Sequence, residues 1–418
     1  MSMSSGTVSS GGAVTTDLFD EVMFRNPHPH YRELRQHHPV SAARTALGPK
    51  GTLLLTRYDD VMTLHTDERF SSQPERMSPL RERLMPRFAQ LLLDSMVFKD
   101  EPDHTRLRRL VNRAFTPKMV AGMQADIESV LDSLLDDIAA KAARGETIDL
   151  VDELAVPLPL TVIAQMLGVS ESDRDEFHDV VHRFTDLPAT GPARLKAIPL
   201  GRRLMRIIDR LADDARRHPD DRIVSALVRV NDEDGDRLSD AEVASMVFLL
   251  LFAGHDTTSG LISTGVHALL EHPDQFALLR EQPELARSTA VEELLRYCSP
   301  VVCGAVRWLT ADVELSGTTV PAGSAVLGMI TSANRDEDHF ADPDVLDLTR
   351  DPNPHVAFAF GPHYCLGNKL ARLEGQLAFE GLARRFSDIR LADGVELSYK
   401  PTQSLRGLRS LPVVLRPT

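Results

Sequence analysis

The chain has 418 residues, of which 42% are hydrophobic and 26% are charged, so a disordered or fibrous protein is excluded and a large core is possible. Lys and Arg number 47 against 61 Asp and Glu, and the net charge of −14 argues against a general nucleic-acid-binding protein. The three cysteines, Cys298, Cys303 and Cys365, form no CxxC pair and no disulfide framework. They favour a reducing, cytoplasmic location.

The N-terminal residues 1–16 are rich in Ser, Gly and Thr, with neither a basic start nor an apolar run. They are predicted to be a disordered tail rather than a signal peptide. Residues 17–418 are predicted to form one domain, because no Pro/Gly/Ser-rich linker interrupts residues 20–415. The longest apolar stretch, Val243 to Ala253, is too short for the roughly 20 residues of a membrane helix, so no membrane anchor is expected.

Helical periodicity dominates the rest of the chain. Apolar residues at three- and four-residue spacing predict helices over 119–144, 152–167, 204–217, 240–271, 283–297 and 366–386. Short apolar or alternating runs predict strands over 51–56, 313–315, 324–329 and 411–415. The predicted fold class is therefore mainly α with small β-sheets.

The helix predicted over 240–271 has an unusual centre. Ser239 and Glu242 form an S-x-x-E capping box at its start, and the residues that follow are apolar on all sides. The run 254–258 (Gly-His-Asp-Thr-Thr) then places polar groups where each costs stability unless it has a partner. The pattern alone leaves open a satisfied polar network, a kink or a functional site.

Cys365 lies where a loop containing Gly and Pro runs into the start of an amphipathic helix. A thiol there is exposed to the positive end of the helix and to backbone N–H donors, both of which favour the thiolate. Cys298 and Cys303 are interpreted as small buried hydrophobic residues.

The segment around Cys365 resembles the F-x-x-G-x-H-x-C-x-G haem-binding signature of the cytochrome P450 family. All five specified positions match: Phe358, Gly361, His363, Cys365 and Gly367. Ala359 stands where many members carry a further glycine. Four other elements resemble the family in its order, from about residue 20 onward: His104 with Arg108, the run Ala253 to Thr258, Glu293 and Arg296 with Arg350, and Arg307.

The resemblance implies the cytochrome P450 fold, with haem b (iron protoporphyrin IX) between the long central helix and the cysteine loop. It implies that Cys365 is the axial thiolate, that Phe358 packs beside it, and that amides around Gly367 hydrogen-bond the sulfur. The haem propionates need cationic or N–H partners. The expected partners are His104, Arg108, Arg307 and His363.

On the other face of the haem, the resemblance implies an oxygen-activating site. Ala253 and Gly254 are expected to leave room for dioxygen. The Thr257 hydroxyl can bond back to the Ala253 carbonyl, and we expect it to stabilise the activated oxygen while Asp256 relays protons. His255 is expected to have a structural role. Glu293, Arg296 and Arg350 are expected to form a buried structural triad.

The family's substrate pocket implies contributions from segments 79–97 and 177–204, from the central helix and from 301–305. These segments supply an apolar, adaptable set of side chains: Met85, Met96, Phe184, Phe248, Leu249, Phe252, Val301 and Val302. A bulky lipophilic substrate that is hydroxylated or epoxidised is predicted. The 40 Arg against 7 Lys are typical of high-GC bacteria, which favours a secondary metabolite intermediate: a polyketide, macrolide, terpenoid or peptide.

Two alternatives remain at this point. One is a fatty-acid hydroxylase or peroxygenase, although peroxygenases typically lose the acid–alcohol pair that Asp256 and Thr257 retain. The other is a haem-thiolate protein that binds a ligand without turnover.

Electrons are expected from a ferredoxin with its NAD(P)H-dependent ferredoxin reductase, because the sequence contains no flavin or dinucleotide fingerprint. The stretch 104–118 holds five cations and no acid, and two more cations follow Cys365. They are Arg106, Arg108, Arg109, Arg113, Lys118, Lys369 and Arg372. They are interpreted either as a docking patch for an acidic ferredoxin or as an ordinary solvated face.

Overall fold

The computed structural model describes residues 14–73, 85–185, 197–230 and 235–418. Where the sequence predicts one domain over 17–418, the chain divides into two compact units, each assembled from separate stretches. Unit 1 comprises Met1–Glu75, Gly260–Cys365 and Asp393–Leu411. Unit 2 comprises Arg76–Ser259, Leu366–Ala392 and Pro412–Thr418.

Unit 1 is built on a six-stranded sheet with the order β1-β2-β3-β9-β6-β4. Its strands are β1 (Thr15–Asp17), β2 (Val40–Arg44), β3 (Leu53–Leu55), β4 (Phe70–Ser71), β6 (Arg307–Leu309) and β9 (Ala325–Gly328). β3 and β9 pair in parallel at the centre. Their side chains alternate between two core clusters, with Leu54 and Leu327 in one and Leu55 and Val326 in the other, as the two-residue period of a strand requires.

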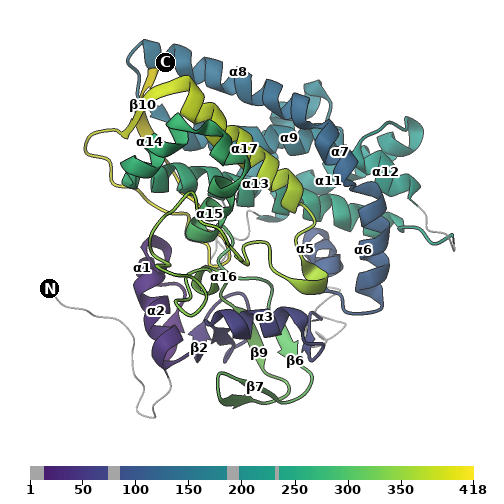
Figure 1. Ribbon diagram of the computed structural model, residues 1–418. Coiled ribbons are helices and arrows are strands. Elements are labelled where there is room, and N and C mark those ends of the chain that lie inside the picture. The colour runs from purple at the N-terminus through teal and green to yellow at the C-terminus, as the bar shows by residue number, and fades with distance from the viewer. Residues whose placement is uncertain (1–13, 74–84, 186–196, 231–234) are drawn as a thin grey trace. The chain divides into compact units, whose positions relative to one another are not determined.

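Helices and a hairpin complete unit 1 (Figure 1). The helices are α1 (Glu21–Arg25), α2 (His28–His37), α3 (Tyr58–Thr66), α14 (Pro273–Glu281), α15 (Thr289–Cys298) and α16 (Ile330–Ala333), with 3-10 turns η5 (Pro283–Arg287) and η6 (Gly361–His363). The hairpin is β7 (Val313–Leu315) and β8 (Thr318–Val320).

Strand β1 corrects part of the predicted N-terminal tail. Thr15 and Thr16 were predicted to be disordered, but they pair with Ala42 and Ala43 of β2, and the Thr16 side chain is buried. The order comes from a partner strand more than 20 residues away, which composition does not reveal. Residues 1–13 of the predicted tail lie outside the described residues.

Unit 2 is mostly helical. Its helices are α5 (Arg87–Leu93), α6 (Asp103–Ala114), α7 (Pro117–Gly122), α8 (Gln124–Ala143), α9 (Pro157–Leu167), α10 (Arg174–Thr185), α11 (Ala197–Arg217), α12 (Ile223–Arg229), α17 (Asn368–Arg385) and most of α13 (Asp240–Glu271). Short turns are η1 (Met96–Phe98), the π-helical η2 (Val151–Ala155) and η3 (Glu171–Asp173).

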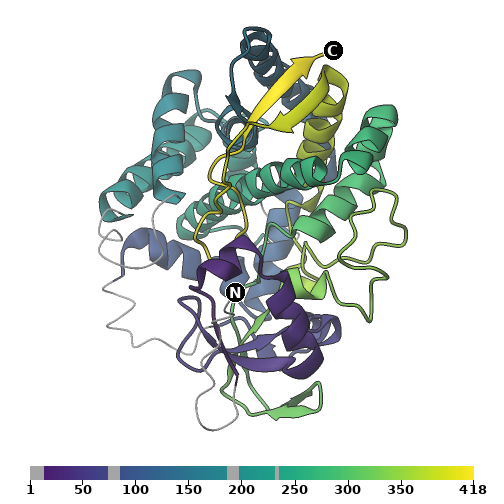
Figure 2. The same ribbon diagram turned by 90° about the vertical axis from the view of Figure 1, so that its left-hand side faces the viewer.

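Close packing and a small sheet hold unit 2 together. α8 and α17 lie side by side, and a Cβ on Gly381 of α17 would lie only 2.8 Å from the Leu135 side chain of α8 (Figure 1). The C-terminal strands β10 (Phe386–Leu391) and β11 (Pro412–Pro417) pair antiparallel (Figure 2). β11 also pairs with β5 (Ile148–Asp149).

The long helix α13 has the predicted bounds, and its capping box is confirmed. The Ser239 N–H donates to Glu242 Oε2 at 2.7 Å, and the Glu242 N–H donates to Ser239 Oγ at 3.3 Å. Among the described residues α13 is the one helix long and apolar enough to cross a membrane, but 67% of its apolar window is buried, as in the core helix of a soluble protein.

Two other predicted helices each consist of two successive helical elements. The helix predicted over 119–144 is α7 followed by α8, because Thr116 caps a separate short helix whose first residue is Pro117. The helix predicted over 283–297 begins as the 3-10 turn η5 before α15.

Candidate active site

The cysteine loop of unit 1 is a tight backbone structure. The Cys365 N–H donates to the Phe358 carbonyl at 3.0 Å, and the Tyr364 N–H donates to the Gly361 carbonyl at 3.0 Å. Gly361 has φ +67°, and a Cβ there would lie 2.5 Å from the His65 carbonyl oxygen of α3. Only glycine fits that approach, which explains the second specified position of the motif.

Ala359 is the position where the sequence departs from the common form of the motif, and its φ of +59° is left-handed. Alanine pays a steric cost there that glycine avoids, partly offset by the greater freedom of glycine in the unfolded chain. Ala359→Gly is therefore expected to raise the free energy of unfolding by about 0.5–1 kcal/mol, measured by denaturant titration. The control is Ala357→Gly, at a buried position without positive φ, which is expected to lower the free energy of unfolding. A lower free energy of unfolding in Ala359→Gly would contradict the interpretation.

A group of basic and imidazole side chains lies at one edge of the unit 1 sheet. His363 Nε2 lies 3.0 Å from the Oγ of the buried Ser72. Ser72 follows β4, which pairs with β6, the strand that begins at Arg307. Arg307 is only 5% exposed. Burial and the positive charge of Arg307 lower the pKa of His65 to about 4. The N–H donors of these arginine and histidine side chains suit the binding of carboxylates.

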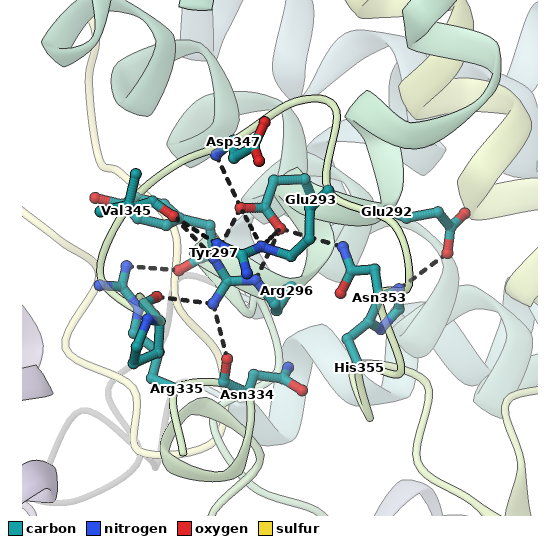
Figure 3. A network of polar contacts seen from close by, with 12 residues as sticks. Glu292, Glu293, Arg296, Tyr297, Asn334, Arg335, Val345, Asp347, Asn353 and His355 are labelled. Carbon is teal, nitrogen blue, oxygen red and sulfur yellow. Dashed lines mark hydrogen bonds and ion pairs between the residues drawn. The ribbon is translucent and has the colours of Figure 1, made fainter. Parts of the chain in front are cut away.

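Glu293, Arg296 and Arg350 are brought together in unit 1. Figure 3 shows the Glu293 and Arg296 side chains of this group. The two Glu293 oxygens accept from Arg296 at 2.7 and 2.8 Å and from Arg350 Nε at 3.1 and 3.2 Å. The Glu293 and Arg296 side chains are 0% exposed. The remaining Arg296 N–H groups donate to the carbonyls of Asn334, Pro343 and Val345. This complete set of partners compensates the loss of hydration of the buried ions.

The polar centre of α13 lies in unit 2. The Thr257 hydroxyl donates to the Ala253 carbonyl at 2.7 Å, so the predicted back-bond is confirmed. His255 is buried, and its Nδ1 lies 3.0 Å from the Leu251 carbonyl, in keeping with a structural role. A less buried stripe follows the helical spacing along α13: Leu249, Phe252, Ala253, Asp256 and Thr257. A Cβ on Gly254 would lie 3.1 Å from the Ile163 side chain of α9.

Helix α6 carries His104 and Arg108 one turn apart, as predicted. His104 is buried, and its Nδ1 lies 3.6 Å from Glu101 Oε1. Arg106 is not an outward member of a basic face, because it pairs with Asp236 at 2.7 Å and Glu242 at 2.6 Å. The charge of Arg106 is therefore engaged by two acids of unit 2, and its part in a docking patch stays a prediction.

Gly367 immediately precedes α17. A Cβ at this position would meet no atom within 4 Å among the described residues. Packing among the described residues therefore gives no steric reason for glycine here, in contrast to Gly361.

Three of the predicted pocket residues form an aromatic cluster in unit 2, centred on Phe184 of α10. Its ring lies 6.5 Å from Phe248 and 6.1 Å from Phe252, both on α13. The sequence prediction missed Phe88 of α5, which lies 5.3 Å from Phe184. Phe88 sits over Gly201 of α11, where a Cβ would lie 2.3 Å from the ring.

The other predicted pocket residues are distributed between the units. Met96 is buried in η1, Met85 precedes α5, and Leu249 lies on the α13 stripe. Val301 and Val302 belong to unit 1, where each packs against a core cluster. Parts of the predicted pocket segments, 79–84 and 186–196, lie outside the described residues.

Glu374 of α17 is a buried acid that the sequence prediction did not single out. Its Oε2 atom is buried without a hydrogen-bond partner among the described residues, and burial raises its pKa to about 8. The folded state therefore holds a proton that the unfolded chain releases near its ordinary pKa of 4.5. The stability that this proton supplies is complete below about pH 4.5 and is lost as the pH rises toward 8.

Glu374→Gln is accordingly expected to flatten the pH profile of stability. Between about pH 4.5 and 8, this one group should lower the free energy of unfolding of the wild type by up to about 1.4 kcal/mol per pH unit. The variant should not show this loss. Urea titrations at pH 5, 7 and 9 measure the difference. Parallel profiles for the two proteins would contradict the expectation.

Comparison with known proteins places the chain in a family. The model of the family described as Cytochrome P450 matches residues 18–405. The vitamin D(3) 25-hydroxylase of Pseudonocardia autotrophica is 41% identical over 97% of this chain and 98% of that protein. The nocardicin C N-oxygenase of Nocardia uniformis subsp. tsuyamanensis is 41% identical over 92% of this chain and 95% of its own. The cytochrome P450 PksS of the Bacillus subtilis 168 bacillaene polyketide synthase superposes with a TM-score of 0.86, at 36% identity, over 96% of this chain and 99% of that one.

The chain belongs to the cytochrome P450 family. It has the P450 fold, mainly helical with small sheets, and it is a monooxygenase of the soluble bacterial type that uses haem b. Such enzymes take a substrate, O2 and electrons from redox partner proteins.

Proposed function

We propose that the protein hydroxylates or epoxidises a bulky lipophilic small molecule, and that the Cys365 thiolate would hold the haem iron. The residues fit the cofactor, because the loop presents a thiol with its backbone fixed by the Phe358 carbonyl, and basic side chains occupy the neighbouring sheet edge. When bound, a haem with a thiolate ligand supplies the activation of O2 for attack on C–H bonds.

Arg307 and His363 are proposed to bind haem propionate, and the same role is proposed for His104 and Arg108. Arginine offers two N–H groups in a plane and a permanent charge, and each imidazole adds one donor. The hydroxyl of Ser72 would fix the orientation of the His363 ring through their 3.0 Å contact.

Asp256 and Thr257 are proposed to deliver protons while bulk water is excluded. The back-bond to Ala253 fixes the rotamer of Thr257, and its oxygen remains able to accept a second hydrogen bond. Asp256 lies beside it on the partly exposed stripe of α13, where a carboxylate can exchange protons with solvent. Ala253 and Gly254 are proposed to leave room for O2, because alanine has only a methyl side chain and glycine has none.

The aromatic cluster is the observation that carries the proposed substrate class. Phe88, Phe184 and Phe252 are each partly exposed and join the less buried face of α13. A surface of phenyl rings suits a large apolar molecule. The relatives named for vitamin D(3), nocardicin C and a polyketide synthase support a natural-product intermediate of the polyketide, macrolide, terpenoid or peptide type.

The first test is the absorption spectrum of the dithionite-reduced protein with carbon monoxide. The wild type and Cys303→Ser should give the long-wavelength Soret band of thiolate ligation, and Cys365→Ser should not. Cys303 is a fair control because it is buried and its Sγ makes a long contact of 3.8 Å to the Gln403 carbonyl. A band that persists in Cys365→Ser would contradict the proposal. Titration of candidate substrates, followed by the spin-state shift, then defines the substrate class.

A cytoplasmic ferredoxin with its NAD(P)H-dependent reductase is the proposed electron source. Arg109 and Arg113 of α6 and Lys118 of α7 are exposed. Arg113→Glu is expected to slow reduction by ferredoxin about tenfold at low salt, with the CO spectrum unchanged. Stopped-flow reduction at two ionic strengths measures this, and equal rates for Arg113→Glu and wild type would exclude Arg113 from docking.

A further inference from the structure

Side-chain hydrogen bonds anchor residues 353–356, the segment that leads into the cysteine loop (Figure 3). Asn353 Nδ2 donates to Glu293 Oε2 at 3.1 Å. The Val356 N–H donates to Oδ1 of the fully buried Asn334 at 2.8 Å. Between these two anchors lies His355, whose side chain is 4% exposed and contacts Glu292 of α15 at 2.9 Å.

The hydrogen bonds of His355 fix its tautomer. The backbone N–H of Ala357 points to Nδ1 at 3.2 Å, and an amide can only donate, so Nδ1 accepts and carries no proton. The ring proton is therefore on Nε2, which donates to Glu292 Oε2. His355 is a neutral imidazole that bridges a carboxylate of α15 to the backbone two residues further along the chain.

The bridge ends one residue before the cysteine loop. Ala357 is followed by Phe358, whose ring lies 6.1 Å from the His355 ring and whose carbonyl accepts the Cys365 N–H at 3.0 Å. A continuous chain of contacts thus runs from Glu292 through His355, Ala357 and Phe358 to the backbone of Cys365.

We propose that His355, as a neutral Nε2–H bridge between Glu292 and the Ala357 amide, is a positioning residue for the Cys365 thiolate. The inference rests on the proposed ligation of haem by Cys365. Glu292 and His355 would then support the cysteine loop together with the triad of Glu293, Arg296 and Arg350. Without the bridge, Phe358 and Cys365 move more freely, and the bond between thiolate and iron is lost more readily.

Two substitutions separate the halves of the bridge. His355→Asn keeps an acceptor for the Ala357 N–H in an Asx-type turn but cannot reach Glu292. His355→Gln keeps a donor for Glu292 but has no acceptor at the δ position. His339→Gln is the matched control, because His339 contacts Asp59 at 3.0 Å in the same unit but has no place in the chain to Cys365.

The first readout is conversion of the reduced CO complex from the long-wavelength to the short-wavelength form under mild heating. His355→Asn and His355→Gln are each expected to convert about fivefold faster than wild type, the effect of one lost hydrogen bond, and His339→Gln at the wild-type rate. The second readout is hydrogen exchange of the Ala357 amide in the haem-loaded protein. This exchange should accelerate in His355→Gln and remain slow in His355→Asn.

A double-mutant cycle tests whether Glu292 acts through His355. Glu292→Gln retains an acceptor oxygen and should behave like wild type, whereas Glu292→Leu should match His355→Asn. The combination of Glu292→Leu with His355→Asn should convert no faster than either single variant. Additive effects, or conversion equally fast in His339→Gln, would overturn the bridge and leave only a general loss of stability.

The experiment distinguishes this inference from the proposed function. A wild type without the long-wavelength band would refute ligation by Cys365 itself. A band that is present but indifferent to every His355 and Glu292 variant would refute the bridge alone.

Discussion

Replacing Arg296 by leucine is expected to lower the free energy of unfolding by about 3–5 kcal/mol, because Glu293 would remain as a buried carboxylate without its main counter-ion. The substitution also removes the Arg296 donors from the carbonyls of Asn334 and Pro343, and it leaves the Val345 carbonyl with only its 3.3 Å contact to Arg350. Denaturant unfolding of the haem-loaded protein measures the loss, and the yield of haem-loaded protein should fall with it.

Arg217→Leu is the matched control for this effect. Arg217 pairs with Asp214 at the same three-residue spacing as Arg296 with Glu293, but the two side chains are 66% and 61% exposed. An exposed pair of this kind contributes about 0–1 kcal/mol. If the two leucine variants destabilised the protein equally, burial would not be the source of the Arg296 effect.

Asp256→Asn is expected to reduce product formation about a hundredfold or more, while substrate still binds, because the amide cannot exchange a proton in the catalytic range. Thr257→Val should have a different signature. Loss of its hydroxyl should leave NAD(P)H consumption largely intact and divert it to hydrogen peroxide. The ratio of product to NAD(P)H consumed, together with a peroxide assay, distinguishes the two variants.

Thr258→Val is the control for Thr257. Its hydroxyl makes the same type of back-bond, to the Gly254 carbonyl at 3.2 Å, but Thr258 is buried away from the less buried stripe of α13. Its substitution should change the product ratio much less. Equal uncoupling in Thr257→Val and Thr258→Val would indicate a general distortion of α13 rather than a specific function of Thr257.

The elements that could be predicted from sequence are those whose determinants are local. Helix α13 has the predicted bounds because a capping box starts it and a long apolar run continues it. The predicted strand 313–315 also has its observed bounds as β7, in a hairpin with a two-residue turn. Strands β1 and β2 could not be predicted, because their residues carry no strand pattern of their own and their order comes from pairing, of β1 with β2 and of β2 with β3.

The same distinction between local and distant determinants applies to the residues of the candidate site. Cys365, Thr257 and the Glu293–Arg296 pair are visible in the sequence because their partners lie within a few residues or belong to a recognisable motif. His355 and Phe88 were missed, since a lone histidine and a lone phenylalanine carry no local signal. The acid partners of Arg106 lie at least 130 residues away along the chain, so local sequence could not predict these ion pairs.

The contact between Phe88 and Gly201 has a consequence for how this enzyme can evolve. Because the ring occupies the space that any side chain at 201 would need, a larger residue at 201 is tolerated only after Phe88 has become smaller. The two positions lie 113 residues apart (201 − 88) but are linked by this contact, so the order of mutations decides which variants are viable. A library that varies them one at a time would miss pocket shapes that only the pair can reach.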